Sequence, residues 1–373
     1  MAMAKELESF LDHFEDLEDP RVERTRLHPI PEILLTTVCG VIAGCEGWNE
    51  IEEFGRTRLE LLRQYLAFEN GIPSDDTLRR FFRALDPKQF QRCFQSWCRQ
   101  WFTLPEPTQI AIDGKTLRGS RDGDRKALHL VSAFATEARI VLAQQPVSEK
   151  SNEITAIPEL LAVLELKGTT VSIDAMGCQH AIAQKIVDGG ADYVLGLKGN
   201  QGLLHDDVKT LFENPPARIE FHHDEQHDKG HGRIETRRAT CTDQIDWLRE
   251  RHPQFASIGS IIQIESRREI GEQVQTERRY YIASFTADAP RCNRSTREHW
   301  GIENCLHWVL DMSFGEDQSR IRKGHAVANL AVIRHAVLNV LQTLKGKRDS
   351  IKRLRRKAGW EPDFLQKVLG DMG

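Results

Sequence analysis

The sequence lacks the patterns that define several other classes of protein. Its 373 residues include eight cysteines but no Cys-x-x-Cys pair, so neither a zinc ribbon nor a thioredoxin-type motif is supported. No apolar run approaches the roughly 20 residues that a membrane span needs. The acidic N-terminus lacks the basic-then-apolar order of a signal peptide, and internal repeats and low-complexity segments are missing. We therefore expect a cytoplasmic protein with no membrane partner, whose cysteines are reduced core residues.

Charge is present in both signs but is unevenly distributed. Hydrophobic residues make up 40% of the chain and charged residues 28%, which is typical of a globular protein large enough for two or three domains. The net charge is only -4, yet residues 318–357 contain twelve lysines and arginines against one acid, Asp349. This run predicts a surface for a polyanion, although a solvated helix face would have the same composition.

The first 104 residues show helical apolar spacing and little strand alternation, which predicts an all-helical N-terminal domain. Within it, the stretch "IPSDDTLRRFFRAL" begins with a helix cap at Ser74 or Asp75. The exposed face of that helix would carry three arginines: Arg79, Arg80 and Arg83. A helix-turn-helix that binds DNA ends and an ordinary helical bundle both fit this pattern.

The pattern then changes to α/β, and we predict one such domain with a mixed sheet over residues 105–345. It would begin with a meander of strands at 109–117, 127–136 and 139–147. Helix and strand patterns then alternate: a helix at 153–164, a strand at 169–174, a helix at 178–188 and a strand at 192–198. The remaining segments are a β-rich insertion at about 214–290, helices at about 293–311 and 325–344, and a basic tail at 346–373.

Two of the predicted core strands end in an acid. "TQIAIDGKTLRGS" runs through Ile110 and Ile112 into Asp113, and "TTVSIDAMGC" runs into Asp174. Either acid alone is explained by a strand end or by a helix cap. Because an unpaired buried charge is costly, the two together predict a shared cation site.

The helix "STREHWGIENCLHWVLD" offers a third acid, Glu303, one turn from His299 and His307. Carboxylate oxygens suit Mg²⁺ or Mn²⁺, and a pair of ions suits in-line attack on a phosphodiester. A surface glutamate beside histidines is one alternative. A zinc site formed by His299, Glu303 and His307 is another alternative, but on a straight helix the two histidines would lie about 12 Å apart along the axis.

Several segments resemble the DDE transposases of bacterial insertion sequences, in the H-repeat-associated branch. They are "IPSDDTLRRFF", "AIDGKTLRGS", "VSIDAMGCQ", "YVLGLKGNQ", "HGRIETR" and "REHWGIENCLHWVLDMSFGEDQSR", in the expected order across nearly the whole chain. The resemblance implies a ribonuclease-H-like core interrupted by a β-rich insertion. It also implies that Asp113, Asp174 and Glu303 are the catalytic, metal-binding triad, with two Mg²⁺ or Mn²⁺ ions as cofactors. DNA would be the substrate, and a homo-oligomer would form on it.

The sequence departs from that of related transposases at the positions around Glu303. Their signature, Tyr-x2-Arg-x3-Glu-x6-Lys, is replaced here by Thr296, His299 and Leu310 at the positions around Glu303. Its phosphate-gripping role therefore does not carry over. The candidates to replace it are His299, Asn304, Arg320 and Arg322.

Other polar residues near the predicted triad are expected to contact DNA. They are Lys115, Arg118, Lys198, Asn200, Gln201, Arg233, Arg237, His299, Trp300, Asn304, Arg320, Arg322 and Lys323. Trp300 or Trp308 would stack on a displaced base, with ordinary packing as the alternative. The cluster His222, His223, His227 and His231 fits a zinc site or a polar, DNA-contacting loop. The stretch "KSNEI" at 150–154 also resembles the family, and we expect only a helix-capping role for it.

The sequence therefore predicts a DNA transposase that cuts and joins strands at element ends. A nuclease of the same fold, which cuts without joining, would use the same residues. A catalytically idle DNA-binding remnant is the third hypothesis, and the intact set of acids argues against it.

Overall fold

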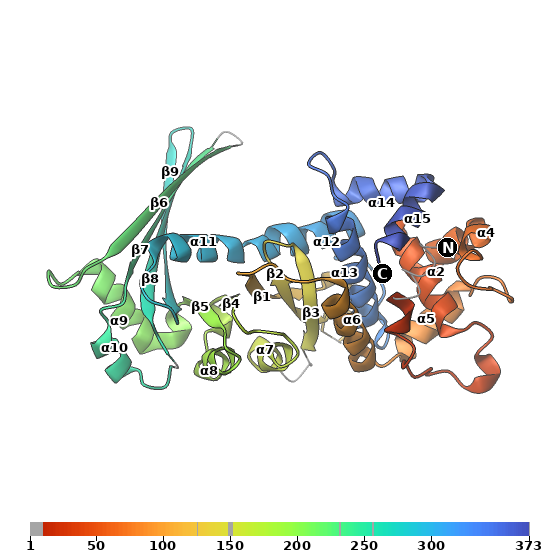
Figure 1. Cartoon of the computed structure of the whole chain (residues 1–373), viewed down its shortest axis with the longest axis horizontal. Helices are drawn as coiled ribbons and strands as arrows, with labels where there is room; N and C mark the ends of the chain where they lie inside the picture. The colour runs from red at the N-terminus through yellow and green to blue at the C-terminus, as the bar shows by residue number, and fades with distance from the viewer. Residues whose placement is uncertain (1–9, 125, 148–151, 231–232, 256, 373) are drawn as a thin grey trace.

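The structure is a computed structural model that describes residues 10–124, 126–147, 152–230, 233–255 and 257–372. The molecule is elongated (Figure 1). Helices from both ends of the sequence gather at one end, a mixed sheet lies in the middle, and long β-hairpins form the other end.

Five strands form the core of the sheet. They are β1 (Gln109–Thr116), β2 (His129–Ala135), β3 (Ile140–Val147), β4 (Thr170–Ile173) and β5 (Asp192–Leu197). Their order is β3-β2-β1-β4-β5. The first three form an antiparallel meander, and β4 and β5 run parallel to β1. This topology is the ribonuclease-H-like core, and it confirms the predicted fold class.

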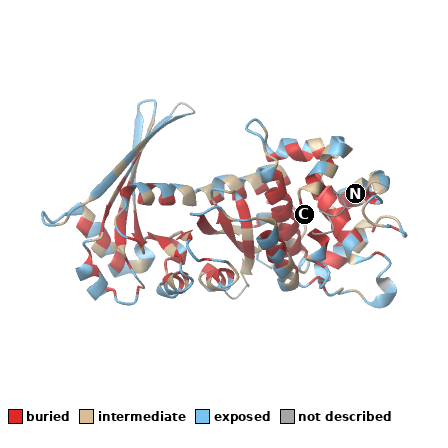
Figure 2. Ribbon diagram, viewed as in Figure 1, coloured by how far each residue is buried: buried red, intermediate tan, exposed pale blue. Residues whose placement is uncertain are grey.

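The β-rich insertion continues the same sheet. Its strands are β6 (His222–Gly230), β7 (Arg233–Thr242), β8 (Ser260–Ile270) and β9 (Gln273–Ala283), with α9 (Gly202–Glu213) before them and α10 (Asp246–Arg251) between the hairpins. Strand β9 pairs antiparallel with β5, so the sheet has nine strands. The hairpins are exposed toward their tips and buried where they join the core (Figure 2).

Helices cover both faces of the core strands. One face packs against α7 (Glu153–Leu161) and α8 (His180–Asp188), and the other against α11 (Ala289–His299), α12 (Trp308–Phe314) and α13 (Ala326–Thr343). Alternation along β1 divides these cores, because Ile110 and Ile112 pack on the α7 side and Ala111 on the α12 side. None of the described helices, α13 with its eighteen residues included, qualifies as a membrane span.

The helical end is built from both termini of the chain. Its N-terminal helices are α2 (Ile30–Ile42), α3 (Trp48–Thr57), α4 (Leu59–Leu62), α5 (Asp75–Ala84) and α6 (Pro87–Trp101). They share one apolar core with α12, α13 and the last two helices, α14 (Ile351–Trp360) and α15 (Pro362–Gly370). The predicted cap of α5 forms, because Ser74 Oγ accepts the N–H of Thr77 at 3.3 Å. Two of its three arginines, Arg79 and Arg80, pair with acids of the same helix.

The C-terminal segment differs from the basic tail expected from its composition. Residues 351–370 form α14 and α15, and the Nε1 atoms of Trp97 and Trp101 donate to the carbonyls of Met372 and Asp371, at 2.7 and 2.8 Å. An apolar stripe of α14, including Ile351 and Leu354, is buried beneath the basic residues. The positive charges concealed this stripe in the sequence, because lysines and arginines occupy the positions between its members.

Arg355 on α14 is the basic residue that holds this segment in place. It is 3% exposed, and its guanidinium donates to the carbonyls of Val41, Cys45 and Ser313. It also lies 4.2 Å from the ring centre of Phe314. Arg355 therefore ties α14 to α2, to the loop after α2 and to α12.

We predict that Arg355→Met lowers the free energy of unfolding by about 3 kcal/mol, because it removes charged hydrogen bonds and leaves buried carbonyls unpaired. Urea denaturation measures this change. The control is Arg356→Met, an exposed neighbour on the same helix, which should change the value by less than about 0.5 kcal/mol. Equal effects of the two substitutions would contradict this account of α14.

Candidate active site

The first two predicted acids meet because β1 and β4 are adjacent and parallel. Residues Ile110 and Ile112 pair with Val171 and Ile173, and β4 ends there. Beyond that point β1 continues beside β2 alone, so Asp113 lies on a core strand at the place where its other neighbour stops.

Asp174 follows β4 directly and caps a short 3₁₀ turn, Ala175–Gly177, by accepting the N–H of Met176 at 2.9 Å. The capping role considered for this acid is therefore present. It coexists with the cation-site arrangement, because one carboxylate atom each of Asp113, Glu153 and Asp174 lie within 4.8 Å of one another.

Glu303 reaches Asp113 from the helices on the other face. Between α11 and α12, residues Glu303–His307 form a π-helical turn, a feature that often marks functional sites. The Nδ1 of His307 lies 3.5 Å from Glu303 Oε2 and 3.7 Å from Asp113 Oδ2. One ligand-type atom each of Asp113, Glu303 and His307 fall within 4.8 Å of one another. Asp113 is thus the residue that both groups of acids share.

The electrostatics of the site centre on Asp113. Burial raises the pKa of Asp113 to about 7; His307 opposes this shift, whereas Glu303 and Asp174 add to it. The pKa of Glu303 is lowered, chiefly by its contact with His307. A partly buried carboxylate crowded by further acids is stabilised by a divalent cation, and a donor set made mostly of carboxylates fits one. The residues present therefore suit the metal that such a fold implies.

His299 does not join the acids. Burial lowers the pKa of His299 to about 4, so its ring is neutral, and its Nδ1 lies 3.1 Å from Ser172 Oγ. Within the described residues, neither group of possible metal donors includes His299, so the His-Glu-His zinc alternative is not formed.

The histidine cluster of the insertion is not a donor group either. Three of its members, His222, His223 and His227, lie exposed on β6 and are absent from both donor groups found in the described part of the chain. The fourth, His231, lies outside the described residues.

Two residues expected to contact DNA, Lys115 and Arg237, make close contacts within the protein. Lys115 has a side chain only 10% exposed, and its Nζ contacts Asp311 at 2.5 Å and Glu316 at 2.7 Å. Arg237 is 7% exposed and donates to Asn293 and Thr296 of α11. These two side chains fix helices against strands. Both side chains have partners distant in sequence, which a local pattern does not show.

Other members of that predicted set lie at the surface. Asn200 and Gln201 donate to the carbonyls of Ala175 and Cys178, and so brace the turn after Asp174. Arg322 donates to Gly119 O at 2.9 Å, and Lys323 pairs with Asp122. The exposed members are Arg118, Lys198, Asn200, Arg233, Trp300, Asn304, Arg320 and Lys323. Trp308 is 61% exposed, so ordinary packing does not explain it.

A pocket of about 930 Å³ lies between the hairpins and α11, and we call it the arginine pocket. It is lined by Arg139, Arg233, Arg237, Arg268, Arg279, Arg294, Arg297, Trp300 and Asn304, among others. The guanidinium of Arg279 lies 4.6 Å from the ring centre of Trp300. Because Asn304 lines this pocket and Glu303 faces Asp113, the arginine pocket and the acids are neighbours on one run of helix.

Sequence reasoning missed one acid of the site, Glu153. It lies in "KSNEI", whose expected role was only to cap a helix, and its Oε1 is 2.6 Å from Nε2 of His129. The available signal was an acid in a matching motif with no assigned chemistry.

Comparisons with known proteins identify the family and the relatives of this chain. The model of the Transposase DDE domain matches residues 104–340, and the DDE_Tnp_1-associated model matches residues 11–98. The H repeat-associated putative transposase YhhI of Escherichia coli (strain K12) is 40% identical and aligns over 99% of each chain. The Putative transposase YncI of Escherichia coli O157:H7 is 41% identical over 97% of this chain and 95% of that one.

Among solved structures, the piggyBac transposase synaptic complex with hairpin DNA aligns with a TM-score of 0.42 and 11% identity, over 98% of this chain and 79% of that chain. That likeness is too distant to support a further conclusion. The family match spans more than half of the chain, and the relatives align over nearly all of it. The chain therefore belongs to the DDE transposase family, in its H repeat-associated branch.

Proposed function

We propose that this protein cuts DNA strands at the ends of an insertion sequence and joins them to target DNA, with Asp113, Asp174 and Glu303 as its catalytic, metal-binding residues. The observation that carries the proposal is the approach of acids from the end of β4 and from the π-helical turn to one partly buried acid of β1, Asp113. Membership of the DDE transposase family supports the same assignment.

The arrangement suits hydrolysis of one phosphodiester and then transfer to another. Bound Mg²⁺ or Mn²⁺ would activate the attacking oxygen and neutralise charge on the leaving oxygen. The protein's part is to hold the acids rigidly: the backbone N–H of Met176 fixes Asp174, and His307 orients Glu303. Cutting and joining would use this single site, because water and a freed 3′-hydroxyl attack phosphorus in the same way.

Under this proposal, DNA binds to the arginine pocket and to the exposed basic residues around the acids. Guanidinium groups bind phosphates in bidentate fashion, and the 39% exposed ring of Trp300 offers a stacking surface beside Arg279. The exposed basic face of α14 is a second candidate surface. We also propose that the protein forms a homo-oligomer on DNA. Only its membership of the family supports this part of the proposal.

We predict that Asp113→Asn, Asp174→Asn and Glu303→Gln each lower strand cleavage about a thousandfold or more, because each removes a metal-binding carboxylate. The substrate is DNA that flanks the gene and carries the element ends, and cleavage and joining are followed on gels. DNA affinity should stay within about threefold of the unsubstituted protein. The control is Asp188→Asn, at the exposed end of α8.

The alternatives separate in the same assay. Cleavage without any joined product would identify a nuclease. Binding with no cleavage by the unsubstituted protein would identify an idle remnant. Loss of DNA binding in all three acid variants would point to a folding role for these acids.

We predict that protein stripped of all metal regains activity with Mg²⁺ or Mn²⁺ alone, because the donors are mostly carboxylate oxygens. Metal content and cleavage are measured on the same sample. The prediction fails if only Zn²⁺ restores cleavage and if His307→Ala removes both that activity and the bound zinc.

We predict that Arg294→Gln in the arginine pocket weakens DNA binding and reduces the salt slope of log K by about one unit, because one phosphate contact is lost. Fluorescence anisotropy at several salt concentrations measures the slope. The matched control is Arg251→Gln, an exposed arginine on α10 that pairs with Asp207. An unchanged slope for Arg294→Gln would remove the pocket from the DNA-binding surface.

A further inference from the structure

Glu153 approaches the catalytic acids from the opposite face of the sheet. It is the first residue of α7, which packs on the face that Ile110 and Ile112 share, whereas Glu303 comes from the α11–α12 face. Even so, one of its carboxylate oxygens lies within 4.8 Å of both Asp113 and Asp174. The site therefore has four acids, and two faces of one sheet contribute them.

The approach of Glu153 depends on the residue after Asp113. Gly114 would direct any side chain toward α7, and a Cβ there would collide with Glu153 Oε1 and His129 Nε2. Only glycine leaves this space open. The missing side chain thus forms a gap beside β1 through which Glu153 reaches the edge where Asp113 lies.

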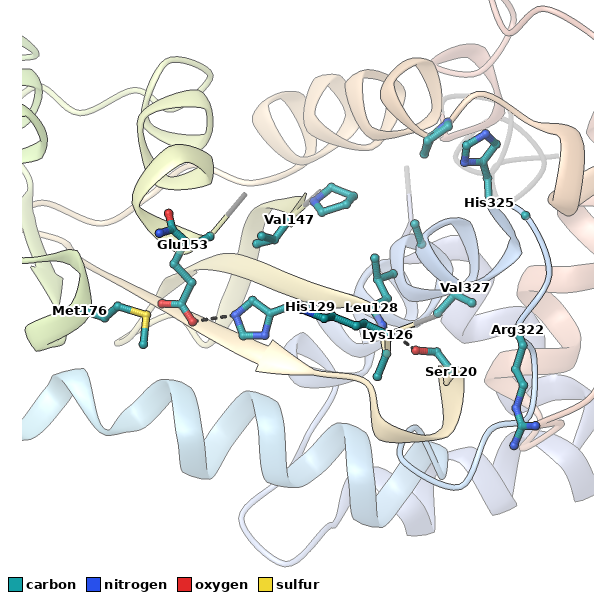
Figure 3. A pocket seen from close by; sticks show the side chains of 16 residues that line it. Ser120, Lys126, Leu128, His129, Val147, Glu153, Met176, Arg322, His325 and Val327 are labelled. Atoms are coloured by element: carbon teal, nitrogen blue, oxygen red, sulfur yellow. Dashed lines mark hydrogen bonds and ion pairs between the residues drawn. The ribbon is translucent and has the colours of Figure 1, made fainter. Parts of the chain in front are cut away.

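A histidine fixes the orientation of this carboxylate. His129 Nε2 lies 2.6 Å from Glu153 Oε1, and His129 Nδ1 lies 2.8 Å from Thr116 Oγ1. Figure 3 shows Glu153 and His129 facing each other along the wall of a pocket of about 540 Å³, with Met176 beside them. Carboxylates that bind metals are commonly hydrogen-bonded by a neighbouring group that fixes their orientation.

An ordinary structural role does not account for these contacts. Acids are frequent in the first turn of a helix, where the helix dipole favours them, but they usually lie at the surface. Glu153 is only 9% exposed and faces two further carboxylates. Such crowding of negative charge costs free energy unless a cation lies among the oxygens.

A second group of possible metal donors includes His307. His307 is 5% exposed, and its Nδ1 faces Asp113 and Glu303 at 3.7 and 3.5 Å. Its Nε2 has no hydrogen-bond partner among the described residues. Two donor groups therefore share Asp113, one with Glu153 and Asp174 and the other with Glu303 and His307.

We infer that Glu153 is a fourth metal-binding carboxylate, which holds one divalent cation together with Asp113 and Asp174, while Glu303 and His307 face the second cation across Asp113. This inference rests on the proposed function and adds a residue to its site. His129 is a positioning residue, because it touches Glu153 and not the metal.

Binding of Mn²⁺ alone, followed by electron paramagnetic resonance, tests this assignment. We expect Glu153→Gln to weaken Mn²⁺ binding at least tenfold, as Asp174→Asn does. The matched control is Glu159→Gln, an exposed acid on the same helix, which should leave binding unchanged. Because Gln keeps the hydrogen bond to His129 and removes a crowded charge, the metal-free variant should melt no lower than the unsubstituted protein.

The outcomes are distinct. If Glu153→Gln binds Mn²⁺ as Glu159→Gln does, while Asp174→Asn loses it, the inference is overturned and the three-acid site stands. If Asp113→Asn and Asp174→Asn also keep full binding, the metal site of the proposed function fails as well.

A second measurement needs no variant. Fe²⁺ in place of Mg²⁺, with ascorbate and peroxide, cuts the backbone next to the bound ion. The unsubstituted protein should be cut near residue 153 as well as near residues 113, 174 and 303. Cuts at the other three places without one near residue 153 would overturn the assignment of Glu153.

Discussion

The structure is organised around a single unfavourable charge, that of Asp113 on a core strand. Burial raises the pKa of Asp113 to about 7; His307 opposes this shift, whereas Glu303 and Asp174 add to it. A divalent cation among these oxygens would stabilise such a carboxylate. The end of β4 at Ile173 opens the necessary space on one side, and the π-helical turn delivers Glu303 and His307 on the other.

A buried ion network sets the distance between the strand and the helix that face each other in the site. Lys115 lies two residues beyond Asp113 and binds Asp311 of α12 and Glu316 just after it. Glu316 is 2% exposed and lies 3.7 Å from Arg334 of α13. Burial opposes the charge of Lys115, but Glu316 and Asp311 raise the pKa of Lys115 above its usual value. Removing one charged residue of the network would leave the other charges buried without a partner. The network therefore holds α12 in register with β1.

The sequence was informative where structure follows local periodicity and failed where partners are remote. Alternating apolar residues located the five core strands, and the ends of two of them located Asp113 and Asp174. Glu303 required the family resemblance, because a glutamate on an amphipathic helix is ordinary. Glu153 was missed because its significance depends on the gap at Gly114, which no local pattern reveals. In the sequence, Lys115, Arg237 and Arg355 look like basic residues of the surface. Only their partners, which are distant in sequence, show that they are buried and link separate elements.

The place of the insertion explains why the arginine pocket and the acids lie side by side. Because β9 pairs with β5, the hairpins lie next to α11, and arginines from β7, β8, β9 and α11 surround Trp300. The π-helical turn follows within a few residues and carries Glu303 to Asp113. One run of helix thus links the arginine pocket to the acids. Under the proposed function, the arginine pocket binds the DNA backbone and the acids act on the reacting phosphate. This one run of helix then sets the distance between them, independently of any movement at the tips of the hairpins.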